Sequence, residues 1–395
     1  MKIELNKFKL PIKLDNDYEY VNHLRGMLDK YIEEINKITN RSDDMIENVK
    51  ENVQLIIESL KCYYNADIDT AKNKILNLLI KYKNTPFIVS KLDKNYAFRG
   101  IAPFEEIHTP NHEKHYEELN TTELSFFKAR IGNTTFKKND MLHIPFDKRE
   151  LIKTQRFSIP GVPCLYLGTT SYVCWLEMNK PQDSEFNVSS YKIPGELKIL
   201  NLVGDQMLIN GLGAYLSNDG SEKENFKLVE TMIEIFPLIY ATSYSINNSN
   251  RQFKSEYIIS QLIMQCLQEL EIDGVAYVSK KLERSIIGYM QCINLAIPIK
   301  YVGDYIYENS INKYGQIFKN IKLTNPINLA EYQKLVHFDI HVDKYSFINS
   351  CFSNGYTSQI RLAGKDIVYQ ECTFSKFDNY LCSQVHEISE IFNDN

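Results

Sequence analysis

The sequence predicts an α/β protein with a helical region at its N-terminus and an extension at its C-terminus. Apolar residues recur every three or four positions in the first 95 residues, which is typical of amphipathic helices. From about residue 96, short β-like runs alternate with Gly, Pro and Asn. A chain of 395 residues can also bury a substantial core in more than one domain. We therefore expect three parts, residues 1–95, 96–300 and 301–395.

Three helices are expected in the first part. One has an apolar stripe over residues 21–38, and another follows the N-cap candidates Ser42, Asp43 and Asp44. The third runs over residues 68–82. Two interpretations of the stripes stay open. They pack on the next domain, or their heptad-like spacing pairs two copies of the chain in a homo-oligomer.

The middle part alternates between strands and helices, which favours a mixed sheet. A long helix over 254–271 precedes the turn at Asp273-Gly274. The polar segment at about 204–250 has the composition of an insertion or an elaborated loop. In the C-terminal part a final helix is expected near 376–392. The predicted strands cover 125–131, 164–168, 275–279 and 292–299.

Composition excludes several classes of partner. The formal net charge is −5, which argues against a surface that coats nucleic-acid phosphates but is compatible with a local basic pocket. The N-terminus has no apolar stretch like that of a secretory signal. The sequence also contains no run of about 18 apolar residues, the length that a membrane span needs. The eight cysteines are dispersed without a CxxC pair. We expect a reduced, cytoplasmic protein that binds neither nucleic acid nor membrane.

A carboxylate lies on the apolar side of a short predicted helix. With Thr170 or Ser171 as N-cap, Glu177 follows Val173 by four positions and Cys174 by three, and it shares their face. Burying a carboxylate there is unfavourable unless it has hydrogen-bond partners or a ligand. Two purely structural explanations stay open. Glu177 forms a buried ion pair with an arginine and has no catalytic role, or the helix is rotated so that Glu177 is merely exposed.

The residues before this helix point to an anion with an attached ring. Arg156 lies in a loop bounded by Pro and Gly, and Tyr166 lies mid-strand, on the face opposite Leu165 and Leu167. The hydroxyl-rich helix start offers backbone N–H groups to an anion. An arginine, a tyrosine ring and a carboxylate at one strand–helix junction would suit a pyrophosphate-linked ribose.

The stretch RFSIPGVPCLYLG followed by VCWLE resembles the core of the RES-domain family, named for its Arg, Glu and Ser. SFFKARI is similar to the family's opening strand, and SEYIISQLIMQCLQELEIDGVAYVSKK is similar to the helix–turn–strand that ends at its serine. The resemblance covers roughly residues 120–300. It implies a mixed-sheet core distantly similar to ADP-ribosyltransferases, and an enzyme that cleaves the nicotinamide–ribose bond of NAD. Many members are toxins of toxin–antitoxin pairs, and others resemble antiphage defence proteins.

The resemblance implies three catalytic residues. Arg156 would bind phosphate or the nicotinamide-side ribose, Glu177 would stabilise the oxocarbenium-like ribose, and Ser279 would hydrogen-bond nicotinamide or ribose. Tyr166 would stack on nicotinamide, and Ser158 is assigned to substrate binding.

The family's first arginine has two candidates, Arg130 and Lys128, because the strand reads FFKAR. A lysine there would still neutralise phosphate but could not make a bidentate contact.

No cofactor or metal is expected, with NAD as the substrate and water or phosphate as the acceptor. The resemblance thus implies an NAD glycohydrolase or NAD phosphorylase, and we expect control by an antitoxin or another regulatory protein. His108, His112 and His115 lie in a polar stretch interrupted by proline, typical of a linker. Two alternatives stay open: transfer of ADP-ribose to a macromolecule, and a non-catalytic module that binds a nucleotide.

Overall fold

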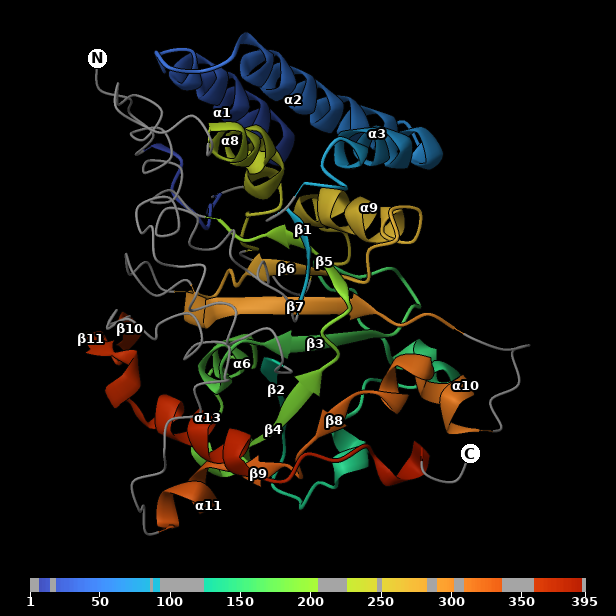
Figure 1. Ribbon diagram of the computed structural model, residues 1–395, viewed down its shortest axis with the longest axis vertical. Coiled ribbons are helices and arrows are strands. Elements are labelled where there is room, and N and C mark those ends of the chain that lie inside the picture. Colours follow the sequence, from blue (N-terminus) through green and yellow to red (C-terminus); the bar gives the residue numbers. More distant parts are fainter. Residues whose placement is uncertain are drawn as a thin grey trace.

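The computed structural model shows an α/β protein with a mixed sheet and an N-terminal helical region (Figure 1). This confirms the fold class predicted from the sequence. None of the described helices combines the length and apolar composition that a membrane span needs. The structure describes residues 7–14, 19–85, 88–92, 124–204, 226–246, 251–282, 290–301, 309–335 and 359–392.

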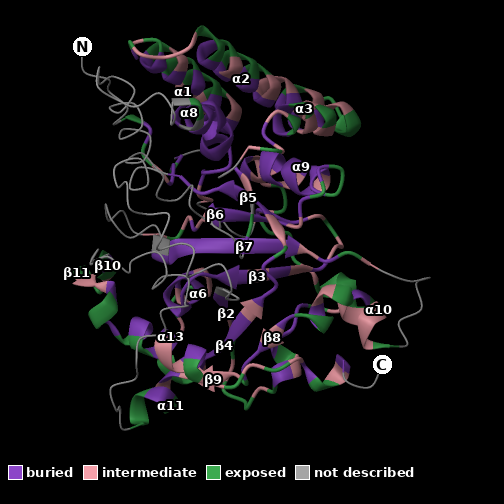
Figure 2. Ribbon diagram, in the orientation of Figure 1, coloured by how far each residue is buried: buried purple, intermediate pink, exposed green. Residues whose placement is uncertain are grey.

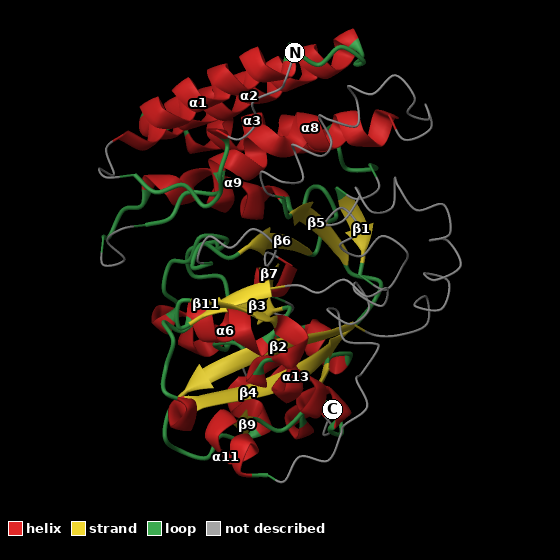
Figure 3. Cartoon of the chain, turned by 90° about the vertical axis from the view of Figure 1, so that its left-hand side faces the viewer, coloured by secondary structure: helices red, strands yellow, loops and turns green. Residues whose placement is uncertain are grey.

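The three N-terminal helices form where the sequence predicts them. Ser42 Oγ accepts a hydrogen bond from Met45 N, and the Asp67 carboxylate accepts one from Thr70 N, so each cap begins its helix. The apolar stripes are buried in one core together with two later helices. Figure 3 shows this helical layer at one end of the sheet. The helices are α1 (Tyr20–Ile35), α2 (Asp43–Tyr64), α3 (Ile68–Ile80), α8 (Phe226–Ala241) and α9 (Ile258–Cys266).

Within one molecule, these apolar stripes therefore pack on the rest of the chain. Tyr31 Oη donates to the backbone oxygen of Ile233 at 2.9 Å, which joins α1 to α8. Pairing of two copies through the same helices stays a prediction.

Helix α8 corrects the expectation of a loop over the whole of 204–250. The sequence FKLVETMIEIFPLIYA is apolar on most sides, and the polar run before it hid this pattern. Its two carboxylates are buried with partners from α2 and its cap. Glu230 accepts from Ser42 N at 2.5 Å, and Glu234 accepts from Asn48 at 3.0 Å. Helix α9 is also shorter than the predicted 254–271, because the chain turns after Cys266.

The sheet has the order β1-β5-β6-β7-β3-β2-β4-β8, with β9 also paired to β4. Among the described strands of this sheet, β5 and β6 pair in parallel and the other pairs are antiparallel. The four predicted strands correspond to β2, β3, β6 and β7. The bounds are β1 (Val89–Lys91), β2 (Leu124–Ile131), β3 (Cys164–Gly168), β4 (Phe186–Ile193), β5 (Lys198–Leu202), β6 (Gly274–Val278), β7 (Ile293–Pro298), β8 (Lys322–Leu323) and β9 (Ile327–Asn328).

Both faces of the central strands are buried (Figure 2). Val275 and Tyr277 of β6 belong to the core shared with the N-terminal helices, whereas Ala276 between them belongs to a second core. Helix α6 (Ser171–Glu177) contributes to this second core, and α13 (Thr373–Ser383) of the C-terminal part packs on α6. The final helix thus lies near the predicted position.

The remaining C-terminal elements are short. They are α10 (Ser310–Tyr314), α11 (Leu329–Lys334), β10 (Gln359–Leu362) and β11 (Lys365–Val368). The division of the chain at residues 95 and 300 stays a prediction.

Candidate functional site

Two residues determine how helix α6 begins beside strand β3: a glycine that allows close packing and a threonine that caps the helix. A Cβ on Gly168 would lie 2.4 Å from the Val173 side chain and 2.9 Å from Cys174 Sγ, so only glycine allows this close approach. Thr170 Oγ1 accepts from Val173 N at 3.0 Å, as the sequence predicts. It also donates to the backbone oxygen of Gln291 at 2.6 Å. The helix starts at Ser171 and ends at Glu177.

A carboxylate from the C-terminal part of the chain binds the start of this helix. Asp378 accepts a hydrogen bond from Ser171 N at 3.0 Å and another from Tyr369 Oη. Burial raises the pKa of Asp378 to about 7, although the hydrogen bonds from Ser171 and Tyr369 oppose that shift. The N-terminal end of α6 is therefore fixed by residues about 200 positions later in the chain.

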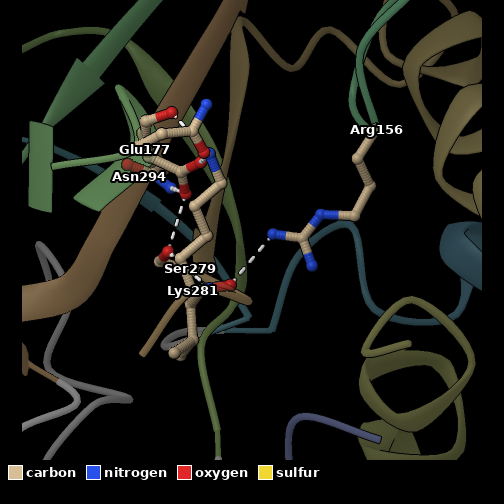
Figure 4. A network of polar contacts seen from close by, with 7 residues as sticks. Arg156, Glu177, Ser279, Lys281 and Asn294 are labelled. Atoms are coloured by element: carbon tan, nitrogen blue, oxygen red, sulfur yellow. Dashed lines mark hydrogen bonds and ion pairs between the residues drawn. The ribbon is translucent and has the colours of Figure 1, made fainter. Parts of the chain in front are cut away.

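Glu177 lies at the other end of α6, where its two carboxylate oxygens have different surroundings (Figure 4). Oε1 accepts from Ser279 Oγ and from Asn294 Nδ2, each at 2.7 Å. Oε2 receives no hydrogen bond from a described residue, and Lys281 Nζ lies 4.0 Å away. The Glu177 side chain is 36% exposed. It is thus neither buried with an arginine nor merely exposed: one oxygen accepts two hydrogen bonds, and the other forms a 4.0 Å ion pair with Lys281.

The two donors come from neighbouring strands. Ser279 follows β6, and its backbone N donates to Cys292 O at 2.7 Å. Asn294 is on β7, directly opposite Tyr277 of β6. Both side chains are buried. The Ser279 hydroxyl donates to Glu177 Oε1 and accepts from Lys281 N at 3.2 Å, and its contact with nicotinamide or ribose stays a prediction.

Sequence reasoning missed Asn294. The only available signal was a polar amide inside the otherwise apolar run CINLAIPI, and a buried amide needs a partner.

Two lysines, Lys280 and Lys281, follow Ser279 and lie near the carboxylate. Lys281 Nζ donates to the backbone oxygen of Glu177 at 2.6 Å and to Asn179 Oδ1 at 2.8 Å. Lys280 is half-buried, and burial holds its pKa well below the usual range. Nearby Arg156 lowers that pKa further, and Glu177 opposes the shift. Neither lysine is among the site residues predicted from the sequence.

Arg156 is buried beside the same strand end. Nη1 donates to Thr242 O at 3.0 Å and Nη2 to Val278 O at 2.9 Å. The guanidinium carbon lies 4.4 Å from the centre of the Tyr277 ring, a cation–π contact. Burial lowers the pKa of Arg156. Since Val278 precedes Ser279, these bonds fix the backbone that carries the serine (Figure 4).

Tyr166 and Ser158 support the loop around Arg156. Tyr166 is on the face opposite Leu165 and Leu167, as predicted, and its hydroxyl donates to Phe157 O at 2.9 Å. Burial raises the pKa of Tyr166 well above its usual value. The Ser158 hydroxyl donates to Gln155 O at 2.9 Å and accepts from Gln155 N at 3.1 Å. It therefore closes the loop on itself, and a role in substrate binding stays a prediction.

Lys128 and Arg130 do not join the Glu177 cluster. Phe127 pairs with Gly168, which pairs with Asn294, and cross-strand partners share a face. Lys128 and Arg130 alternate with Phe127, so the register places them on the opposite face from Asn294.

Each of these two cations has its own surroundings. Arg130 Nη1 donates to Asp140 O at 2.6 Å, and its guanidinium lies over the Phe136 ring. Lys128 is half-buried, and burial, together with nearby Arg130, lowers its pKa to about 7. Contact of either residue with NAD stays a prediction.

Neither a metal site nor a disulfide is found in the part of the chain that the structure describes. No group of three or more His, Cys, Asp or Glu side chains there could hold a metal ion. His108, His112 and His115 lie outside the described residues. The thiols beside α6 are free, and burial raises the pKa of Cys164 to about 12.

Comparison with known proteins gives one informative relative. The chain is 29% identical over 313 residues to a protein of Bacillus subtilis (strain 168) named "Putative toxin YopC". The alignment covers 75% of this chain and 64% of that protein, so the chain spans less than two thirds of its relative's length. No protein-family model matches the chain, and no solved structure matches it. The relative's name indicates a toxin and gives no reaction, so the resemblance to the RES family stays a prediction.

Proposed function

We propose that this protein is an NAD-consuming enzyme of the RES type that cleaves the nicotinamide–ribose bond, and that it acts as a growth-arresting toxin or defence effector. The observation that carries the proposal is the asymmetric carboxylate of Glu177. Ser279 and Asn294 hold Oε1, while Oε2 lies 4.0 Å from Lys281 Nζ on a half-exposed side chain.

The chemistry of the bond requires a group of this kind. As nicotinamide leaves as a neutral molecule, positive charge develops on the ribose, and a fixed carboxylate stabilises that charge. Water then adds to the anomeric carbon and releases a proton, which gives ADP-ribose. With phosphate as the acceptor the product is the ADP-ribose phosphate ester. Glu177 stays unmodified in both cases, and neither route needs a metal or a thiol nucleophile.

Local positive charge suits the rest of the substrate. Arg156 and Lys281 lie near the end of β6, in a chain whose net charge is −5. A pyrophosphate carries two negative charges, which such a cluster would neutralise. The half-buried Tyr166 ring, on the Asn294 face of the sheet, would contact the nicotinamide.

The toxin role is supported by the name of the Bacillus subtilis relative. NAD is required throughout metabolism, so its depletion would arrest growth. An antitoxin or other regulatory protein is the expected partner in this proposal.

The decisive experiment measures nicotinamide release from NAD by the parent and by Glu177→Gln, with and without phosphate. The glutamine keeps an oxygen that accepts from Ser279 and Asn294 but removes the negative charge. We expect release to fall about 100- to 1,000-fold while the fold persists. The matched control is Glu196→Gln at an exposed glutamate, which should keep the parental rate.

Parental turnover in Glu177→Gln would remove Glu177 from the mechanism. Labelled NAD identifies the acceptor in the same assay. Label on protein or nucleic acid would support ADP-ribosyl transfer instead, and NAD retained without nicotinamide release would support a binding module. Growth arrest on expression in a bacterial host should disappear with Glu177→Gln.

A further inference from the structure

Arg156 uses both terminal nitrogens of its guanidinium on backbone oxygens from two separate segments. Nη1 donates to Thr242 O at 3.0 Å, and Nη2 donates to Val278 O at 2.9 Å. The guanidinium carbon also lies 4.4 Å from the centre of the Tyr277 ring and 5.2 Å from that of Phe157. Arg156 is only 8% exposed. Little of this side chain is therefore open to a substrate.

One of these two bonds leads directly to the candidate catalytic carboxylate. Val278, which accepts from Arg156, is followed by Ser279. The Ser279 hydroxyl donates to Glu177 Oε1 at 2.7 Å, and its backbone N donates to Cys292 O at 2.7 Å. A shift of the Val278 carbonyl would therefore move the hydroxyl that holds Glu177.

The other bond leads to the end of α8, which the N-terminal region of the chain holds in place. Tyr20 Oη donates to Ala241 O at 3.0 Å, and Ile12 N donates to Ser243 O at 3.0 Å. The oxygen that accepts from Arg156 belongs to the residue between Ala241 and Ser243. Both acceptors of Arg156 are thus fixed independently of the guanidinium, one by the sheet and one by the N-terminal region.

We propose that Arg156 is a positioning residue, which links the end of β6 to the end of α8 and so orients Ser279 and Glu177 without a hydrogen bond to the substrate. This rests on the proposed function, and it replaces the phosphate or ribose contact that the family resemblance implies. An arginine that binds phosphate directs two parallel N–H groups at it. Here both terminal nitrogens donate to the backbone, while the positive charge still adds to the local field.

The first test separates kcat from KM for nicotinamide release from NAD in the parent, Arg156→Gln and Arg156→Lys. We expect kcat to fall about tenfold or more in both variants, because a misplaced catalytic group slows the chemical step. KM should stay within about threefold of the parental value. Lysine keeps the charge but offers one nitrogen in place of two. A raised KM with parental kcat, or parental turnover in Arg156→Lys, would overturn the proposal.

The second test is a double-mutant cycle with Ser279→Ala. If Arg156 acts through Ser279, Arg156→Gln should lower kcat by less than about threefold once the serine hydroxyl is gone. A change that only destabilises the fold would act equally in both backgrounds. Equal losses in the two backgrounds would therefore overturn the positioning role.

The third test changes the far side of the link with a conservative substitution, which serves also if the Arg156 variants do not fold. Tyr20→Phe removes the hydrogen bond to Ala241 O and should lower kcat about threefold, the equivalent of one weak hydrogen bond. The matched control is Tyr64→Phe, at an exposed tyrosine of α2, which should keep the parental rate. Melting curves of all variants are measured alongside. Parental kcat in Tyr20→Phe would overturn the link through α8.

If the parent releases no nicotinamide, the proposed function fails, and amide hydrogen exchange then tests the link by itself. Exchange over residues 275–280 should be faster in Arg156→Gln than in the parent, because the end of β6 loses a contact that fixes it. Strand β4, in the same sheet, should keep its parental exchange. Parental exchange over 275–280, or an equal rise in β4, would overturn the positioning role separately.

Discussion

Helix α6 is only seven residues long, yet its two ends have opposite surroundings. At the N-terminal end, Thr170 and Ser171 are buried and bonded to Gln291 and Asp378. At the C-terminal end, Glu177 is half-exposed, and one carboxylate oxygen has no hydrogen bond from a described residue.

We expect this difference to separate residues that stabilise the fold from residues that affect turnover within one short helix. A helix of this length has little intrinsic stability, so tertiary contacts must hold it. Those contacts gather at its start and on its buried face, through Gly168, Thr170 and Asp378. Changes at the start of α6 should therefore alter folding, and changes at its end should alter turnover.

The largest expected effect on folding is at Asp378. Its pKa is raised from 3.8 to about 7, so between these values the folded protein binds more protons than the unfolded chain. The parent's free energy of unfolding therefore falls as pH rises through this range and stays lower above it. Each unit of pKa shift corresponds to about 1.4 kcal/mol, so the fall amounts to a few kcal/mol.

Asp378→Asn removes this titration, and its stability should decline less than that of the parent between pH 4 and pH 8. Denaturant unfolding of both proteins across this range measures the difference. Nicotinamide release per folded molecule should stay near the parental value. If the stability of the two proteins declined equally with pH, or if Asp378→Asn lost turnover per folded molecule, the two ends of α6 would not differ in the expected way.

A smaller effect, on turnover, is expected at Asn294. Replacing it with leucine keeps much of its volume but removes one of the two donors to Glu177 Oε1. The carboxylate would lose part of its orientation, and kcat/KM for NAD should fall about tenfold, the equivalent of one hydrogen bond. Steady-state kinetics with a melting curve checks this. If the variant had normal kinetics but a much lower melting temperature, Asn294 would act on stability, as the residues at the start of α6 do, and not on turnover.

The smallest effect on turnover is expected at Lys128, on the opposite face of the sheet from Asn294. Lys128→Met should leave the KM for NAD unchanged. The pKa of Lys128 is lowered from 10.5 to about 7, so the unfolded chain binds more protons between these values. The parent's stability should therefore rise with pH through this range, and the variant should lack that rise. If the variant's KM for NAD rose tenfold or more, the substrate site would have to include β2.

Local patterns in the sequence predicted the segments that carry the site. Strand 164–168 and the helix capped by Thr170 formed as expected, because alternation and capping act over a few residues. The partners of Glu177 were harder to predict. Asn294 lies 117 positions away and Lys281 about 100, and they meet the carboxylate only because β6 pairs with β7.

The position of Lys128 and Arg130 shows the same limit. Alternation places both on one face of their strand, but only the register with β3 reveals that this face is opposite Asn294. Asp378 gave no local signal at all, since its partners are a backbone N–H and a tyrosine brought together by tertiary packing.

The contact between Ser171 and Asp378 also sets an order of events during synthesis. The ribosome makes Ser171 207 residues before the aspartate that binds its backbone N–H. Ser279, Lys281 and Asn294 likewise emerge about 100 or more residues after Glu177. A growing chain therefore exposes Glu177 long before anything can orient it. All of these contacts to Glu177 can be in place only once residue 294, which lies 117 positions after Glu177, has been made.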